Sequence, residues 1–163
     1  MYLSILLWLP LAAGLVAALL PRRLSGPLAL LGSLGALGYA IAFVVDFSSG
    51  GGLQFVTDES WISELGIHYK LGLDGLNLFL VLLTAAAFPV VMLWSVLAPG
   101  DRDVSRDRAY YFHLALGETA VLGALMAQDL ALFVVFFDLM LVPFFFLTGI
   151  FGGPDRIAAV TKL

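Results

Sequence analysis

The chain alternates between long apolar stretches and short polar connections, and this pattern predicts its main elements. Five stretches are long and apolar enough to cross the hydrocarbon core of a membrane as helices of about 20 residues. These stretches comprise residues 2–20, 27–45, 76–98, 110–127 and 130–150. We therefore expect an all-α fold, a polytopic transmembrane helix bundle in which residues 1–163 form a single transmembrane domain.

One longer connection, residues 46–74, separates the second and third stretches. It opens with a flexible run of serines and glycines at residues 48–52. Residues 53–57 and 67–71 then alternate weakly between apolar and polar, which predicts a short hairpin on the outer membrane surface. Asp74 follows, and we interpret it as the N-cap of the third helix, the alternative being a functional charge.

Composition supports the membrane assignment. Apolar residues make up 61% of the chain and charged residues 12%, whereas a soluble domain carries about 25% charged residues. A soluble enzyme and a disordered chain are therefore excluded. The net charge of −4 argues against nucleic acid as a partner. Because the chain has no cysteine, it holds no disulfide, iron–sulfur cluster or cysteine zinc site.

The basic residues predict how the chain is oriented in the membrane. Of the eight basic residues, only Lys70 belongs to the connections on the same side as the predicted hairpin. The other side collects Arg22, Arg23, Arg102, Arg106, Arg108, Arg156 and Lys162. Because cytoplasmic connections are enriched in lysine and arginine, we expect the N-terminus outside and the C-terminus in the cytoplasm.

Glu118 and Asp138 are the two acidic residues inside the predicted spans. The fourth and fifth stretches meet at a tight turn formed by Gln128 and Asp129, so their helices are antiparallel neighbours. Counting from this turn at about 1.5 Å per residue, each carboxyl group lies about 14 Å from the outer end of its helix. We therefore expect both acids on adjacent helices at one depth, near the middle of the bilayer.

An acid at this depth is costly to insert, faces the bundle or water, and usually has a role. Desolvation favours the neutral carboxyl group and a nearby lysine favours the charged one, so a balanced carboxyl can take up and release a proton. We interpret Glu118 and Asp138 as proton-handling acids. The alternative is that each stays protonated and hydrogen-bonds neighbouring helices together.

Two further residues bear on this hypothesis. Pro143 removes a backbone hydrogen bond beside Asp138, which frees a carbonyl for water or produces a packing kink. His113, near the inner end of the fourth helix, is either a candidate proton relay to Glu118 or a hydrogen-bonded interface residue. The sequence contains no spacing typical of a metal site, a phosphate-binding loop or a nucleophile.

The second half of the chain carries an ordered series of residues with recognisable spacing. It consists of Glu118, Asp129-Leu130, Phe133, Phe136-Phe137-Asp138, Leu141-Val142-Pro143 and Gly149-Ile150-Phe151-Gly152-Gly153. With the Leu71–Leu76 entry to the third helix, this series resembles the antiporter-like membrane subunits of respiratory complex I, NADH:quinone oxidoreductase. The Leu-Val-Pro ending favours the subunit M (chain 4) branch. Related subunits occur in cation/proton antiporters and membrane-bound hydrogenases.

This resemblance implies a proton-translocating subunit in the cell inner membrane, with other membrane subunits of complex I, the lipid bilayer and protons as its partners. It implies that Asp138 takes the place of the proton-carrying acid on the fifth helix and that Glu118 matches the acid on the fourth. In the family the fifth-helix acid pairs with a lysine on the seventh helix. The resemblance implies no cofactor and no redox chemistry on this chain, because NADH, flavin, clusters and quinone belong to other subunits.

The chain departs from the family in two respects. Asp138 stands where the family has glutamate, which shortens the side chain by one carbon. Family members also have many more helices, so we interpret the chain as an N-terminal portion produced by truncation or by a split gene. The competing hypotheses are a subunit of a cation/proton antiporter or membrane-bound hydrogenase, and a structural fragment that does not pump.

Overall fold

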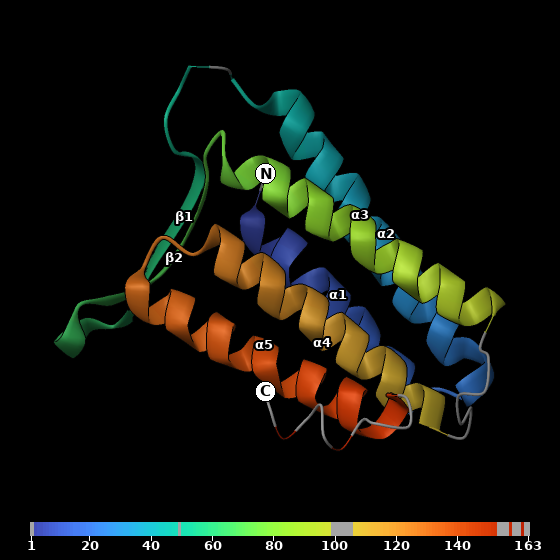
Figure 1. Cartoon of the computed structure of the whole chain (residues 1–163). Helices are drawn as coiled ribbons and strands as arrows, with labels where there is room; N and C mark the ends of the chain where they lie inside the picture. The colour runs from blue at the N-terminus through green and yellow to red at the C-terminus, as the bar shows by residue number, and fades with distance from the viewer. Residues whose placement is uncertain (1, 49, 99–105, 153–156, 158–160, 162–163) are drawn as a thin grey trace.

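The structure is a computed structural model that describes residues 2–48, 50–98, 106–152, 157 and 161 (Figure 1). It is mostly helical, with a small sheet between the second and third helices. The helices are α1 (Leu3–Leu19), α2 (Arg22–Asp46), α3 (Asn77–Leu97), α4 (Asp107–Met126) and α5 (Leu130–Phe151). The strands β1 (Gln54–Ile62) and β2 (Ile67–Leu73) are joined through the short 3-10 helix η1 (Ser63–Leu65). Arg102, Arg156 and Lys162 of the predicted inner set lie outside the described residues.

Among the described residues, three helices are long and apolar enough to cross a membrane: α2, α3 and α5. α1 is equally apolar but has 17 residues. α4 has 20 residues, and its polar side chains, including His113 and Glu118, lower its mean hydropathy. A helix surrounded by other helices can carry such side chains without exposing them to lipid.

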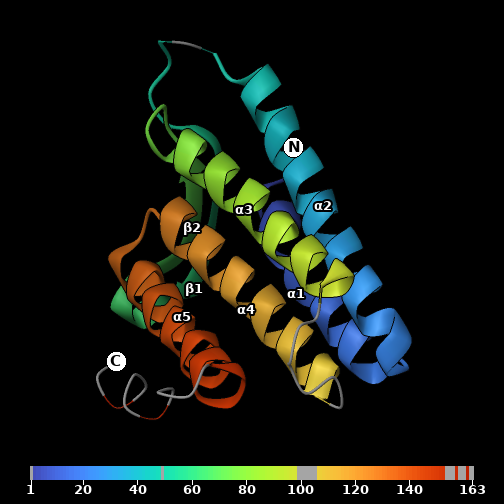
Figure 2. The same ribbon diagram turned by 45° about the vertical axis from the view of Figure 1, so that its right-hand side comes forward.

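α4 is the central helix of the bundle. It packs against each of the four other helices, most extensively against α1 and α5. α5 packs against α4 and the end of β2, so it lies at the edge of the bundle (Figure 2). α4 is therefore covered by other helices on most sides, whereas much of α5 is uncovered in the described structure. This difference determines how far the acidic residue on each helix is buried.

Small residues allow the helices of the bundle to approach closely. A side-chain carbon added at Gly14 of α1 would lie 2.5 Å from Cβ of Ala115 on α4, and one added at Gly32 of α2 would overlap Ala13 of α1. The ring of Phe136 on α5 occupies the space beside Gly123 of α4. These contacts bring α1 close to α2 and α4, and they seat the Phe136 ring of α5 directly against α4.

A two-stranded antiparallel sheet fills the long connection between α2 and α3, and it lies across one end of the bundle (Figure 1). Leu71 and Leu73 of β2 are fully buried and belong to the main apolar core. Tyr69 attaches the sheet to α1, because its hydroxyl accepts a hydrogen bond from Trp8 Nε1 at 3.1 Å and donates one to Ser4 Oγ at 3.2 Å.

The Asp74 side chain accepts hydrogen bonds at the turn just before α3, where the sequence predicted a helix cap. The N–H groups of Leu76 and Asn77 each donate to Asp74 Oδ1 at 2.8 Å, and the Asp74 N–H donates to Asn77 Oδ1 at 2.7 Å. This reciprocal pair satisfies backbone groups that the first turn of a helix leaves without partners. Asp74 therefore caps the turn that leads into α3, although the N-cap position of the helix itself is Leu76.

Two glycines of α2 test the close packing. Gly32→Ala places a methyl group against Ala13 and should lower the free energy of unfolding by about 1–3 kcal/mol. Gly38→Ala is the matched control, because no atom lies within 4 Å of the added carbon, and alanine favours a helix by up to about 1 kcal/mol. Thermal unfolding in detergent should show a lower midpoint for Gly32→Ala only. Equal midpoints for both variants would contradict the packing.

Candidate functional site

Glu118 lies inside the bundle, on the side of α4 that faces α1 and α2. Its side chain is fully buried. One turn earlier on α4, Ala115 packs against Gly14 of α1, and Ser33 of α2 faces the Glu118 carboxyl group. The carboxyl group is therefore enclosed by protein on all sides, although it lies in the middle of a helix of a membrane chain.

Four buried side-chain oxygens on α2 and α4 have no hydrogen-bond partner in the described part of the chain. They are both carboxyl oxygens of Glu118, the hydroxyl of Ser33 and the hydroxyl of Thr119. Buried polar groups nearly always find a partner in a protein or in ordered water. The Glu118 carboxyl group and the Ser33 hydroxyl can bind water between them, which also lets the carboxyl group exchange its proton with its surroundings.

Asp138 lies on the other side of α5, away from α4. The buried face of α5 consists of Leu132, Phe136 and Pro143. Asp138 follows Phe136 by two residues, which is about 200° around the helix, and its side chain is exposed. The structure therefore does not bring Glu118 and Asp138 together.

The contacts between α4 and α5 also set the relative heights of the two acids. A carbon added at Gly117 would lie 3.7 Å from Cγ of Pro143, and one at Gly123 would meet the ring of Phe136. Gly117 is thus opposite Pro143, and Gly123 is opposite Phe136, on two antiparallel helices. Glu118 therefore lies at the height of the residues just before Pro143, about one helical turn along the helix axis from Asp138. The two acids are close in depth, but they face different surroundings. Pro143 itself is buried against α4, which fits a packing role.

His113 lies on the face of α4 that is turned toward α5. Its Nδ1 lies 2.6 Å from the Ala109 carbonyl oxygen in the preceding turn, and its ring lies against Phe146 of α5. Glu118 points to α1 and α2 instead. In the structure His113 is a hydrogen-bonded interface residue, and no contact joins it to Glu118.

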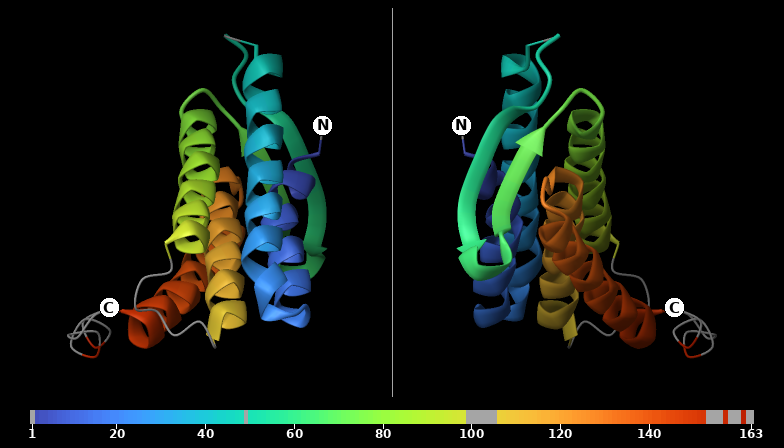
Figure 3. Two further views of the ribbon diagram at one scale, coloured as in Figure 1. Left: turned by 90° about the vertical axis from the view of Figure 1, so that its right-hand side faces the viewer. Right: turned by 90° about the vertical axis from the view of Figure 1, so that its left-hand side faces the viewer.

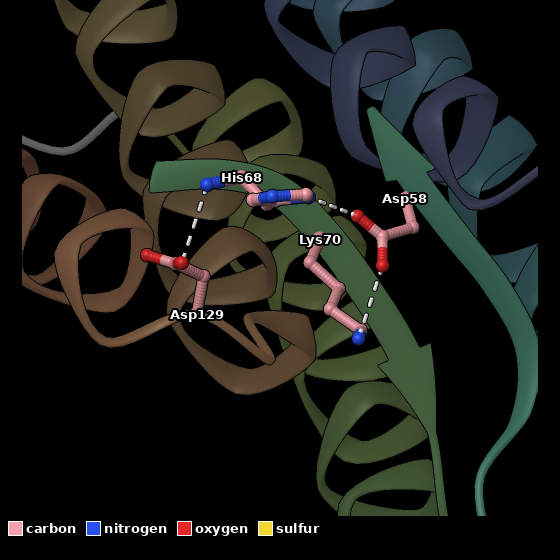
Figure 4. Close-up of polar contacts among 4 residues, drawn as sticks. All are labelled: Asp58, His68, Lys70 and Asp129. Atoms are coloured by element: carbon pink, nitrogen blue, oxygen red, sulfur yellow. Dashed lines mark hydrogen bonds and ion pairs between the residues drawn. The ribbon is translucent and has the colours of Figure 1, made fainter. Parts of the chain in front are cut away.

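A second polar cluster holds the sheet to the turn between α4 and α5 (Figure 4). Asp58 of β1 pairs with His68 Nδ1 at 2.6 Å and with Lys70 Nζ at 3.0 Å, both on β2. Asp129 caps α5 by accepting from the N–H groups of Ala131 and Leu132, and its other oxygen accepts from the His68 N–H at 3.2 Å. One carboxylate thus fixes both a strand and a helix.

These contacts lower the pKa of both carboxyl groups. The pKa of Asp58 lies below its usual value because the His68 and Lys70 side chains hydrogen-bond to the carboxylate. The pKa of Asp129 is lowered mainly by the N–H of Leu132, and then by those of His68 and Ala131. Both contacts therefore depend on the charged form of the acid.

Backbone hydrogen bonds extend the same attachment. The Gln128 N–H donates to the Lys70 carbonyl oxygen at 2.8 Å, and Leu71 forms an isolated bridge with Ala127. Asn77 donates to the carbonyl oxygens of Gly72 and Leu125 at 3.0 and 3.2 Å. β2, the start of α3 and the turn between α4 and α5 therefore form one hydrogen-bonded unit.

Two features of the site did not emerge from the sequence pattern. Ser33 is a small polar residue in an apolar helix, and its position opposite Glu118 depends on how α2 and α4 cross. The pairing of Asp58 with His68 and Lys70 depends on the register of the sheet, in which Asp58 opposes Lys70. Within the described residues, no group of three or more His, Asp or Glu side chains is arranged to hold a metal ion.

Comparison with known proteins identifies what this chain resembles. No protein-family model matches it. It is 35% identical over 171 residues to NADH-quinone oxidoreductase subunit M of Rhodobacter capsulatus, an alignment covering 98% of this chain and 31% of that protein. It is 32% identical to F(420)H(2) dehydrogenase subunit M of Methanosarcina mazei, covering 98% of this chain and 32% of that protein. The resemblance to subunit M is confirmed. The chain spans about a third of the length of these relatives.

Solved structures share the fold. A chain of respiratory complex I from Thermus thermophilus with bound NADH has a TM-score of 0.80 at 24% identity, covering 98% of this chain and 31% of that chain. A chain of the Mrp complex from Dietzia sp. has a TM-score of 0.77 at 22% identity, covering 98% of this chain and 17% of that chain. This chain therefore shares the fold of a chain in each of these two complexes.

The lowered pKa values predict how the sheet responds to acid. The carboxylates of Asp58 and Asp129 are charged at pH values above their usual pKa of about 4, so their contacts are intact there and are lost as the pH falls through the lowered pKa values. In detergent micelles, the NMR signal of the His68 amide proton should show a transition below about pH 4.

Asp129→Asn should remove this transition or reduce its size, because the amide no longer titrates. Glu64→Gln is the control, since Glu64 is exposed in the turn between the strands. A transition that is unchanged in Asp129→Asn would contradict the assignment of this contact to the Asp129 carboxylate.

Proposed function

We propose that this chain is part of a proton-translocating membrane subunit of NADH:quinone oxidoreductase in the cell inner membrane. In such a subunit, electron transfer elsewhere in the complex drives proton movement through acids near the middle of the bilayer. The observation that carries the proposal is the enclosed carboxyl group of Glu118, with both oxygens free of hydrogen-bond partners among the described residues. The similarity to subunit M over 98% of the chain supports it.

Glu118 is suited to hold a proton that reaches it through water. The hydroxyl group of Ser33 adds a polar atom beside the carboxyl group, and together these atoms can anchor a water molecule. Loss or uptake of a proton would change the charge inside a closely packed contact of α1, α2 and α4. A charge change there has a large effect on the neighbouring helices, because the interior screens it weakly.

Asp138 is proposed as the second proton-carrying acid, with a basic partner supplied from outside the described helices. Its side chain points away from α4, toward a side of α5 that no other described helix covers. The relatives are about three times as long as this chain, and the family resemblance implies a lysine partner on a later helix. Aspartate at this position requires such a partner to approach about one carbon–carbon bond closer than glutamate would. His113 remains a candidate relay only through intervening water, because it bonds within its own helix.

We propose that all five helices cross the membrane, with the N-terminus outside, the C-terminus in the cytoplasm and the sheet on the outer side. α2, α3 and α5 each have the length and apolar composition of a membrane span. α1 and α4 would cross the membrane with them, because they pack against these helices in the same bundle. The basic residues Arg22, Arg23, Arg106 and Arg108 all lie at the end of the bundle opposite the sheet, which supports this orientation.

No redox cofactor is proposed on this chain, and we assign NADH, flavin, iron–sulfur clusters and quinone to other subunits. The described residues contain no candidate metal site, and the sequence contains no cysteine. A subunit of a cation/proton antiporter is the second candidate function, and the fold shared with the Mrp complex favours it. The sequence identity of 35% to subunit M against 22% to the Mrp chain makes the oxidoreductase the better supported proposal.

The orientation can be tested with single cysteines, because the chain has none of its own. Glu64→Cys, in the turn of the sheet, should react with a membrane-impermeant maleimide added to intact cells. Arg23→Cys, at the start of α2, should react only after the cells are opened. The reverse labelling pattern would show the opposite orientation in the membrane. Labelling of both residues in intact cells would contradict the proposal that α2 crosses the membrane between them.

The proton role can be tested by substitution in the native complex. Glu118→Gln and Asp138→Asn, introduced into the source organism, should each lower NADH-driven proton uptake by inverted membrane vesicles at least about tenfold. Asp138→Glu, which restores the residue of the family, should retain uptake. Fluorescence quenching of a pH-sensitive acridine dye measures the rate.

Glu64→Gln is the matched control for these variants, because it also turns an acid into an amide but lies outside the spans. Assembly of each variant is checked by the NADH oxidation rate of the same vesicles. Full proton uptake in both Glu118→Gln and Asp138→Asn would overturn the proton role and leave a structural one.

A further inference from the structure

A hollow at the end of the bundle opposite the sheet collects positive charge. It has a volume of about 540 Å³ and is lined by Pro21, Arg22, Arg23, Asp107 and Arg108. Arg22 and Arg23 are the first two residues of α2, and Arg108 is the second residue of α4. Both helices begin at this end, so residues far apart in the sequence meet at one opening (Figure 3).

The three arginines are not neutralised by the described part of the chain. Its ion pairs involve His68 and Lys70 with Asp58, at the far end of the bundle, and none involves Arg22, Arg23 or Arg108. Asp107 is the single acid among the described residues of the lining, so these described side chains together carry a net charge of about +2. All three arginine side chains are exposed and can bind a ligand without breaking an existing contact in the described structure.

The backbone adds to this positive charge. Neither α2 nor α4 has a side-chain cap at its N-terminus. Both helix dipoles place their positive ends at the hollow, where they add to the charge of the three arginines. An oxyanion is the ligand that fits two such helix starts together with guanidinium groups, which bind phosphate oxygens in pairs.

We propose that Arg22, Arg23 and Arg108 form a binding site for the phosphate group of an anionic phospholipid. The site lies where apolar helices end, which is the level of the lipid headgroups, and acyl chains can extend along the exposed apolar side chains of α2 and α3. Basic pockets between membrane helices at the cytoplasmic side are typical sites for such headgroups. The proposal is independent of proton transfer by Glu118 and Asp138.

The test compares lipid binding by the wild-type chain and by the triple variant Arg22→Gln/Arg23→Gln/Arg108→Gln. Native mass spectrometry in detergent measures binding of phosphatidylglycerol and of phosphatidylcholine with the same acyl chains. The wild type should bind phosphatidylglycerol more tightly than phosphatidylcholine, and the triple variant should bind phosphatidylglycerol at least about tenfold more weakly. Lys70→Gln, which removes a positive charge at the other end of the bundle, should bind as the wild type does.

Asp107→Asn should change phosphatidylglycerol binding in the opposite direction. It therefore distinguishes loss of the arginine charges from misfolding of the triple variant. Removing the one acid of the lining should tighten phosphatidylglycerol binding. Unchanged binding in both the triple variant and Asp107→Asn would overturn the proposal, as would equal binding of the two lipids. In a separate arm, inorganic phosphate is added. If millimolar phosphate stabilises the wild type but not the triple variant, while phosphatidylglycerol binds both equally, the site takes free phosphate and the assignment to a lipid is wrong.

Discussion

The burial of the Glu118 carboxyl group is the feature on which the packing of this bundle depends. Glu118 is fully buried because α4 is packed against α1, α2, α3 and α5. If α4 stood at the edge of the bundle, the same residue would face lipid at a high cost in free energy. The central position of α4 thus permits its lower hydropathy, and the apolar helices around it supply the surface that contacts lipid.

Enclosure of this kind requires close contact between helices. Gly14 and Gly32 provide it, because neither position has room for a side chain between α1 and its neighbours α4 and α2. The apolar residues of α5 play a different part. Its buried face is formed by Leu132, Phe136 and Pro143, and most of its remaining surface is exposed. The bundle therefore combines a tightly packed side around Glu118 with an open side around Asp138.

The sequence predicted the helices and the cap at Asp74 well, because long apolar runs and an aspartate before a helix are strong local signals. The expectation that an acid in an apolar run faces the bundle holds for Glu118, which is buried, whereas Asp138 is exposed in the described structure. The sequence did not show which way each acid points. The rotation of Asp138 away from α4 depends on which face of α5 packs, and Phe136 and Pro143 decide this through Gly123 and Gly117 of α4. The contact of Asp129 with the His68 N–H also depends on tertiary structure, because no local pattern joins a helix cap to a distant strand.

The double role of Asp129 has a mechanical consequence. The same carboxylate caps the first turn of α5 and holds β2 at His68, so a displacement of the strand is passed to the start of the helix. An α-helix is stiff along its axis, and Asp138 lies about two and a half turns further along. A displacement of the sheet toward or away from the bundle would therefore be transmitted along α5 and would shift Asp138 by a similar distance.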